Sequence, residues 1–215
     1  VALSTLVATF GLLRDDVAIL IGAMVIAPLL GPNVALSLAS ALGDGALARR
    51  SAKTLAVGVT IAGLLSLLIG ILVFVDPTVD SIASRTSVHP GDVVLALAAG
   101  SAGALAFTSG VATAVIGVMV AVALLPPIVA AGLLLGSGST GAAFGALLLL
   151  VTNLTCINLA GVTTFLIQKI RPRTWWEAEQ AKKATRVAIV SWLAVLLILL
   201  AIIYISASDP GLWPR

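Results

Sequence analysis

Polar side chains inside long apolar stretches are the residues of this chain best suited to chemistry. Within the stretch 142–168, the amides of Asn153 and Asn158 and the hydroxyls of Thr152 and Thr155 form a dense polar stripe, and a further amide, Asn33, stands within 17–42. Spacings of three to five residues place Asn153 and Asn158 on one broad helix face. Amides inside a membrane span are costly unless partnered, so these side chains should face protein or water. Lining of a solute pathway and hydrogen bonding between helices are both consistent with the pattern.

Glycine and proline interrupt two apolar stretches near their middles. Gly31 suits a helix N-cap and Pro32 the first helical position, and Pro127 plays the same part within 111–135, so a half-helix should begin at each. Helix N-termini can hold an anionic group, and the facing carbonyl ends a partly dehydrated cation. We therefore predict a site for a small ion or polar solute at the junction of the two breaks. Its expected residues are Gly31, Pro32, Asn33, Pro126, Pro127, Thr152, Asn153 and Asn158.

Other kinds of site are poorly supported. The single Cys156 lies in an apolar run and the single His89 in a loop, so neither a disulfide framework nor a metal site is expected. No charged residue stands within 54–75, 93–107, 111–135 or 142–168, which disfavours a proton relay through buried carboxylates. We expect no catalytic residues, no cofactor and no nucleic-acid partner, and we do not expect an enzyme.

The elements that must position these residues are membrane-spanning helices. The chain has 215 residues, of which 60% are hydrophobic and 10% charged, too few charges for a soluble surface. The apolar runs predict an all-α polytopic membrane protein. We expect about seven transmembrane segments, at 1–13, 17–42, 54–75, 93–107, 111–135, 142–168 and 187–205. The first is too short to span alone, and the lack of an initiating Met suggests a longer protein.

A twelve-residue pattern occurs twice. Residues 21–32 and 116–127 are identical at seven of twelve aligned positions, far above chance for this composition. Residues 1–75 and 93–168 are therefore predicted to be two repeats, each of three helices with a broken middle one, joined by loop 76–92. A linker at 169–186 and a final helix and tail within 187–215 follow. The alternative is a duplicated bundle whose prolines only kink the helices.

Charge placement indicates how often the broken helices cross the membrane. If each crosses once, segments 44–53 and 168–186 fall on the same side and together hold nine of the twelve Lys and Arg residues. Such an excess marks the cytoplasmic side. Single crossings are favoured over re-entrant hairpins, which would separate the two basic segments, and they make the halves an inverted repeat. Loop 76–92 and the C-terminus are then external.

The segment 169–186 is basic and amphipathic. Residues 174–177, Thr-Trp-Trp-Glu, have capping-box spacing and predict a helix over 175–186. Tryptophans and cations suit a membrane surface, so Arg171, Arg173, Lys182 and Lys183 are candidate ligands of anionic phospholipids in the bilayer. A plain topogenic loop is the alternative.

Small residues are dense in several spans. Pairs such as Gly132 with Gly136 and Gly141 with Gly145, and the run 98–104, predict close helix packing within or between subunits. We expect a homo-oligomer.

Five stretches together resemble a known prokaryotic family. They are residues 21–32 (Ile-Gly-Ala-Met-Val-Ile-Ala-Pro-Leu-Leu-Gly-Pro), Ser84-Arg85-Thr86, residues 98–104 (Ala-Ala-Gly-Ser-Ala-Gly-Ala), residues 122–127 (Val-Ala-Leu-Leu-Pro-Pro) and Thr152-Asn153-Leu154. In this order they are similar to the domain of unknown function 389 family over most of 15–165. The resemblance implies a bacterial or archaeal multi-pass membrane protein, often with extra soluble regions, and it implies no particular catalytic or binding residues.

Two functions of different classes fit these features. The first is a secondary transporter or channel for a small ion or polar solute in a prokaryotic cell membrane, with its site at the junction of two discontinuous helices. The second is a non-transporting, oligomeric, lipid-binding module that anchors a soluble sensory or regulatory domain. A polar cavity at the junction favours the first, and a dry, leucine-packed junction favours the second. Substrate, coupling ion and direction are left open.

Overall fold

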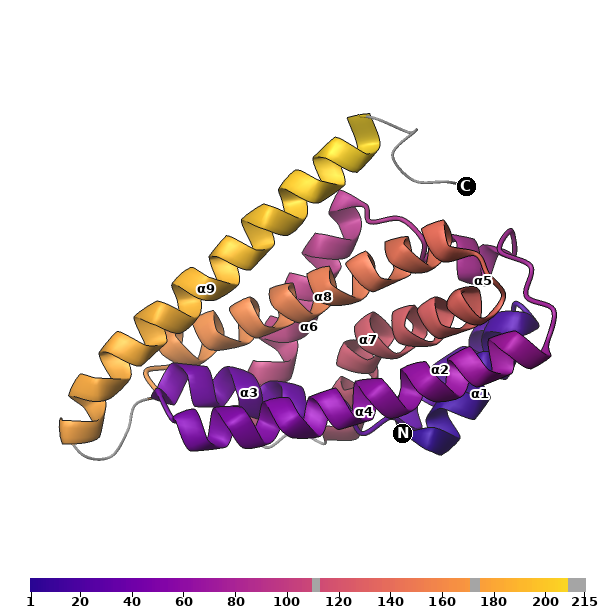
Figure 1. Cartoon of the computed structure of the whole chain (residues 1–215). Coiled ribbons are helices and arrows are strands. Elements are labelled where there is room, and N and C mark those ends of the chain that lie inside the picture. The colour runs from indigo at the N-terminus through magenta and orange to yellow at the C-terminus, as the bar shows by residue number, and fades with distance from the viewer. Residues whose placement is uncertain (110–112, 171–174, 209–215) are drawn as a thin grey trace.

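The structure is a computed structural model and is all-helical wherever it describes the chain (Figure 1). It describes the backbone of residues 1–109, 113–170 and 175–208, and the side chains of 1–109, 123–170, 183 and 185–205. The helices are α1 (Ala2–Leu13), α2 (Val17–Ile26), α3 (Leu30–Leu42), α4 (Gly45–Leu72), α5 (Asp80–Ala83), α6 (Pro90–Ser109), α7 (Thr113–Gly136), α8 (Thr140–Ile167) and α9 (Trp175–Ser208).

The described surface is apolar and the interior is partly polar. Large apolar side chains such as Leu68, Leu95 and Leu197 are exposed on α4, α6 and α9. The buried set includes the polar residues Thr5, Thr9, Asn33, Ser37, Ser66, Thr152, Asn153, Thr155 and Asn158. This pattern suits a chain surrounded by lipid, where polar groups find partners only inside the protein.

Four described helices are long and apolar enough to span a membrane: α4, α6, α8 and the part of α9 from Thr185 to Ile205. The pair α2 and α3 makes a fifth if it is one bent span. Helix α1 and the described apolar part of α7, Ala123–Gly136, are shorter than a full span. The helical membrane class is therefore supported, and the expected total of seven spans stays a prediction.

The break between α2 and α3 lies where proline and glycine predicted it. The two helices meet at an angle of 56° across Ala27–Leu29. The second half starts at Leu30, with Leu29 at the N-cap, so Gly31 and Pro32 are its second and third residues rather than its cap and first residue. Proline is tolerated there because amides in the first helical turn have no partner in their own helix.

The predicted break at Pro126-Pro127 is wrong. Helix α7 runs from Thr113 to Gly136 with both prolines inside it. A proline inside a helix removes one backbone donor and frees the carbonyl four residues earlier, but the helix continues if another group pairs with that carbonyl. In α7 the carbonyl opposite Pro127 belongs to Ala123, and it has such a partner, described below.

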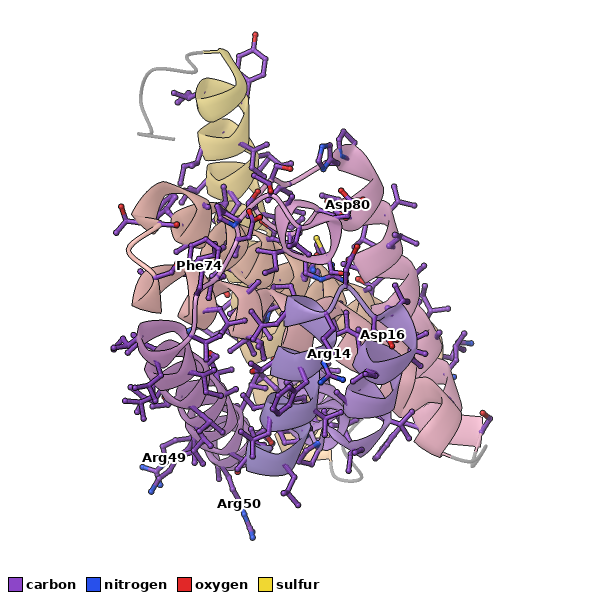
Figure 2. The ribbon with its side chains drawn as sticks, turned by 90° about the vertical axis from the view of Figure 1, so that its right-hand side faces the viewer. Arg14, Asp16, Arg49, Arg50, Phe74 and Asp80 are labelled. Atoms are coloured by element: carbon purple, nitrogen blue, oxygen red, sulfur yellow. The ribbon has the colours of Figure 1, made fainter. Side chains whose placement is uncertain are left out.

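A helix begins inside each of the two basic segments. Helix α4 begins at Gly45, capped by Asp44, whose Oδ1 accepts from Leu47 N at 2.9 Å. Arg49 and Arg50 are therefore on its first turns, and their side chains project from the bundle (Figure 2). The expected helix over 175–186 continues into the last span, so that both form α9.

Both basic segments belong to the same end of the bundle. Thr185 Oγ1 of α9 donates to Ala41 O, near the C-terminus of α3, at 3.0 Å. Gln168 Nε2, after α8, donates to Thr108 Oγ1, near the end of α6, at 2.7 Å. We call this the basic end, and the opposite end, which carries residues 73–89, the loop end. The path from α3 to α4 turns at the basic end, and that from α7 to α8 at the loop end (Figure 1).

Small residues allow backbones to touch where helices cross. A Cβ on Gly70 of α4 would collide with the Leu133 backbone of α7, and one on Gly136 of α7 with the backbone of Leu67 and Gly70. A Cβ on Gly100 of α6 would collide with the Ile157 backbone of α8. The predicted close packing is thus present within the chain, and it fixes α7 against α4 and α6 against α8.

Candidate functional site

The first buried polar group is the α3–α8 amide cluster, made of Asn33, Ser37 and Asn158. Asn158 Nδ2 donates to Asn33 Oδ1 at 2.6 Å and to Leu154 O at 2.9 Å, while Asn158 Oδ1 accepts from Ser37 Oγ at 3.1 Å. All three residues are buried. Asn33 Nδ2 is buried and has no hydrogen-bond partner among the described residues. The cluster ties α3, just after the break, to the middle of α8.

The second polar group is the amide of Asn153, which replaces a donor that Pro127 lacks. Asn153 Nδ2 donates to Ala123 O at 2.8 Å. In an unbroken helix that carbonyl would accept from the backbone N–H of residue 127, which proline does not have. Since a carbonyl can only accept, the amide nitrogen must face it and the amide oxygen must face elsewhere. Asn153 Oδ1 is buried without a hydrogen-bond partner among the described residues.

A cavity of about 430 Å³ opens beside this amide, between α6, α7, α8 and the end of the loop after α5. We call it the α6–α8 cavity. Its lining residues are Ser84, Arg85, Asp92, Leu95, Ala96, Ala98, Ala99, Ala123, Pro127, Leu149 and Asn153. Pro127 lies nine residues before the end of α7, or about 14 Å along the helix. The cavity therefore extends from the loop end to about half the depth of a bilayer core.

The charged residues of the cavity stand at the loop end. Arg85 Nη1 donates to Ser81 O and, at 3.1 Å, to Ser84 Oγ. Burial lowers the pKa of Arg85, and the charges of Asp15 and Asp92 oppose that shift. Asp15 accepts from Ser81 N at 2.9 Å and from Ser81 Oγ, which attaches the corner between α1 and α2 to α5.

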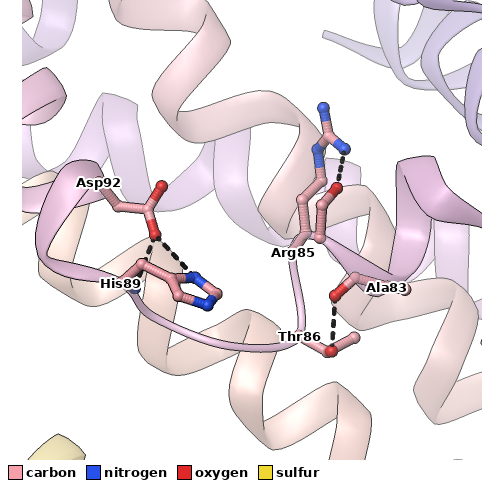
Figure 3. Close-up of polar contacts among 6 residues, drawn as sticks. Ala83, Arg85, Thr86, His89 and Asp92 are labelled. Carbon is pink, nitrogen blue, oxygen red and sulfur yellow. Dashed lines mark hydrogen bonds and ion pairs between the residues drawn. The ribbon is translucent and has the colours of Figure 1, made fainter.

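The carboxylate of Asp92 forms its contacts at the start of its own helix, α6. Its Oδ2 accepts from His89 N at 2.8 Å and lies 3.7 Å from His89 Nδ1. Asp92 thereby caps the start of α6 from the third position of the helix. In Figure 3 the carboxylate of Asp92 is turned toward His89, while Arg85 extends in a different direction. The two opposite charges thus line the same cavity without forming a direct ion pair.

The predicted site residues divide into two groups instead of one. Asn153 contacts α7 beside Pro127, whereas Asn158 contacts α3 beside the other break. Five residues at 100° each rotate the helix by about 140°, so these side chains do not share one face as the sequence analysis proposed. Each amide still lies next to one of the two proline-containing sequences.

The remaining predicted residues are less directly placed. Gly31 is exposed with open space where a Cβ would stand, so it does not face the amide cluster. Thr152 is buried and its hydroxyl has no hydrogen-bond partner among the described residues, and Pro126 is buried in α7. Of the candidate lipid ligands, Arg171 and Arg173 lie outside the described residues, as does the side chain of Lys182, while Lys183 is exposed.

Comparison with known proteins places the chain in a family. The family described as "domain of unknown function (DUF389)" matches residues 24–159, more than half of the chain. The chain belongs to the DUF389 family. Its sequence is also 40% identical over 201 residues to an uncharacterised protein of the archaeon Methanocaldococcus jannaschii. That alignment covers 94% of this chain and 63% of the relative, so the chain spans less than two thirds of the relative's length. No solved structure matches this chain.

The polar features of this DUF389 protein lie inside the matched range. It includes every residue that lines the α6–α8 cavity and all of the amide cluster. Sequence reasoning assigned Arg85 only to an external loop and missed its place in the cavity wall. One signal could have found it: Arg85 is the single Lys or Arg between positions 54 and 168.

Proposed function

We propose that this protein is a secondary transporter or channel that moves a small ion or polar solute across the membrane through the α6–α8 cavity. The observation that carries the proposal is a cavity lined by Arg85, Asp92 and Asn153, open on one side, in a bundle whose exterior is apolar. A purely structural helix interface would be filled by apolar side chains, whereas this one leaves a cavity whose lining includes a cation, Arg85, and a carboxylate, Asp92. Polar cavities at membrane depth are where substrate sites of transporters are found.

The proposal includes an inverted-repeat architecture of three helices in each half. Support comes from the contacts at the two ends: α3 and α8 both end at the basic end, while α4 and α7 run from it toward the loop end. The bent α2–α3 pair and α7 would then cross once each, in opposite directions.

Cysteine labelling tests this topology. In a Cys156→Ser background, Arg50→Cys and Ser84→Cys should react with an impermeant thiol reagent from opposite sides of the membrane. We expect position 84 to be external and position 50 cytoplasmic. Labelling of both from one side would refute the proposed crossings.

A flux assay tests transport itself. Ala98 of α6 lines the cavity and is exposed, so Ala98→Trp should obstruct the cavity without disturbing the core. Val94, one turn earlier, is exposed and is not part of the lining, so Val94→Trp is a matched control. Purified protein in liposomes would be assayed with radiolabelled sodium, chloride, choline and mandelate. We expect flux of one of these, lost in Ala98→Trp and kept in Val94→Trp. Absence of flux for all four, or equal flux in both variants, would contradict the proposal.

The alternative, a lipid-binding anchor for a soluble domain, has two observations in its favour. The archaeal relative is longer than this chain, and only 6% of the apolar span in α9 is buried. In such a module the cavity would be incidental, and both tryptophan variants would leave the function unchanged.

A further inference from the structure

Arg85 is a half-buried cation on the wall of the α6–α8 cavity. Among the described residues no carboxylate oxygen lies within 4 Å of its guanidinium nitrogens. Its described hydrogen bonds are donated by Nη1 alone, to an uncharged carbonyl and a hydroxyl. A guanidinium has five N–H donors in a planar fork that matches an oxyanion, so most of its recognition capacity is left for a ligand.

The nearby carboxylates of Asp92 and Asp15 form their described hydrogen bonds with other groups and not with the remaining N–H donors of Arg85. Asp92 Oδ2 is bonded to His89 N and paired with the His89 ring, and Asp15 Oδ1 is bonded to Ser81. Each carboxylate therefore has a structural role. Asp92 caps the start of α6, and Asp15 attaches the corner between α1 and α2 to α5.

Beyond Arg85 the lining of the cavity is mostly apolar. Leu95, Ala96, Ala99 and Leu149 are among its residues. Asn153 lines the cavity at 6% exposure, but its Nδ2 is held by Ala123 O and its Oδ1 is buried. A ligand held by Arg85 would therefore place an apolar body against this part of the wall.

We propose that the α6–α8 cavity binds a small organic acid, with its carboxylate on Arg85 and its apolar body against α6 and α8. The assignment rests on the proposed function, because it names the solute class of the same cavity. A phosphate ester is a poorer match, since the lining holds one cation and a dianion would keep a second charge unpaired. An inorganic anion has no apolar body to cover the apolar lining, and a simple cation would stand beside Arg85.

A matched series of probes tests the assignment by binding alone. Mandelate carries both the carboxylate and an apolar ring, glycolate lacks the ring, and mandelamide lacks the charge. Isothermal calorimetry and thermal stabilisation of the full chain in detergent would compare these three with tetramethylammonium and chloride. We expect mandelate to bind most tightly, with each missing group costing about tenfold in Kd. Equal affinity across the series, preference for tetramethylammonium or chloride, or no binding of mandelate would overturn the proposal.

Variants connect the affinity to the named side chain. Arg85→Gln should abolish the preference for mandelate over mandelamide and keep the preference for mandelate over glycolate. Arg14→Gln changes an exposed arginine outside the cavity and should preserve both preferences. If Arg85→Gln does not fold, Arg85→Lys serves: it keeps the charge, loses the planar fork, and should weaken mandelate while retaining its advantage over mandelamide. An unchanged preference for mandelate over mandelamide in Arg85→Gln, or an unchanged mandelate affinity in Arg85→Lys, would overturn the assignment.

The binding assay and the flux assay test the ligand class and transport separately. Mandelate binding without flux of any solute would support the ligand class and refute transport. Flux of sodium or choline without mandelate binding would support transport and refute the ligand class.

Discussion

Asn153 and Pro127 should be coupled energetically, because the amide of one supplies the donor that the other lacks. In Asn153→Leu the Ala123 carbonyl loses its bond from Nδ2 and is left partly buried beside an apolar side chain. In Pro127→Ala a backbone N–H returns at position 127, and the ordinary helical bond to the same carbonyl becomes possible. We therefore expect Asn153→Leu to be more destabilising in the natural chain than in a Pro127→Ala background.

The size of the coupling follows from what each background retains. A hydrogen bond contributes about 0.5–1.5 kcal/mol net, and a buried carbonyl left without a donor costs about 1–3 kcal/mol. Bonds between membrane helices average about 0.6 kcal/mol, so the lower part of this range applies. Asn153→Leu also removes the unpaired Oδ1, which stabilises the variant, but it does so equally in both backgrounds and cancels from the difference. We expect a coupling energy of about 1 kcal/mol.

A double-mutant cycle measures this coupling. The four proteins would be unfolded by denaturing detergent in mixed micelles and followed by far-ultraviolet circular dichroism. Additive effects of the two substitutions would refute the view that Asn153 compensates for Pro127. The sign is equally decisive, because a larger cost of Asn153→Leu in the Pro127→Ala background would mean that the amide serves another partner.

Two further predictions concern packing and the amide cluster. Gly70→Ala should destabilise the protein by about 1–3 kcal/mol, because its Cβ would collide with the Leu133 backbone. Gly22→Ala has open space around its Cβ and should be neutral or stabilising. The same unfolding assay compares the two variants, and equal effects would contradict the close crossing of α4 and α7. Ser37→Ala removes a buried hydrogen bond to Asn158 and should lower the stability by about 1 kcal/mol. Ser40→Ala removes only a hydrogen bond to its own helix and should change the stability by less than about 0.5 kcal/mol. A larger effect of Ser40→Ala would contradict a stabilising role of the α3–α8 amide cluster.

The helical membrane class could be read from the sequence because it depends on composition and run length alone. The position of the break before α3 could also be predicted to within two residues, because the effect of a proline such as Pro32 on the helix is local. The false break in α7 shows the limit of such reasoning. Whether an internal proline interrupts a helix depends on a partner for the freed carbonyl, and here the partner is 30 residues away in sequence.

The candidate site was predictable in its residue types more than in its arrangement. Asn33, Asn153 and Asn158 stood out because amides are rare in apolar helices, and all three are buried. Their division between two helix interfaces depends on which neighbours surround α8, and no local pattern encodes that. Arg85 and Asp92 were overlooked because a loop between spans suggests solvent, while the fold brings the loop after α5 back over the mouth of a cavity.

The bonds between Asp15 and Ser81 attach the first half of the chain to the loop that carries Arg85. One residue further on, the backbone of Thr86 lies so close to Gly145 of α8 that a Cβ there would collide with it. Arg85 is thus held between the two halves, while Asn153 belongs to the second half alone. A rigid displacement of the halves would change the separation of these two side chains. A solute that contacts both would then bind one arrangement more tightly than the other, and its binding energy would itself drive the protein toward that arrangement.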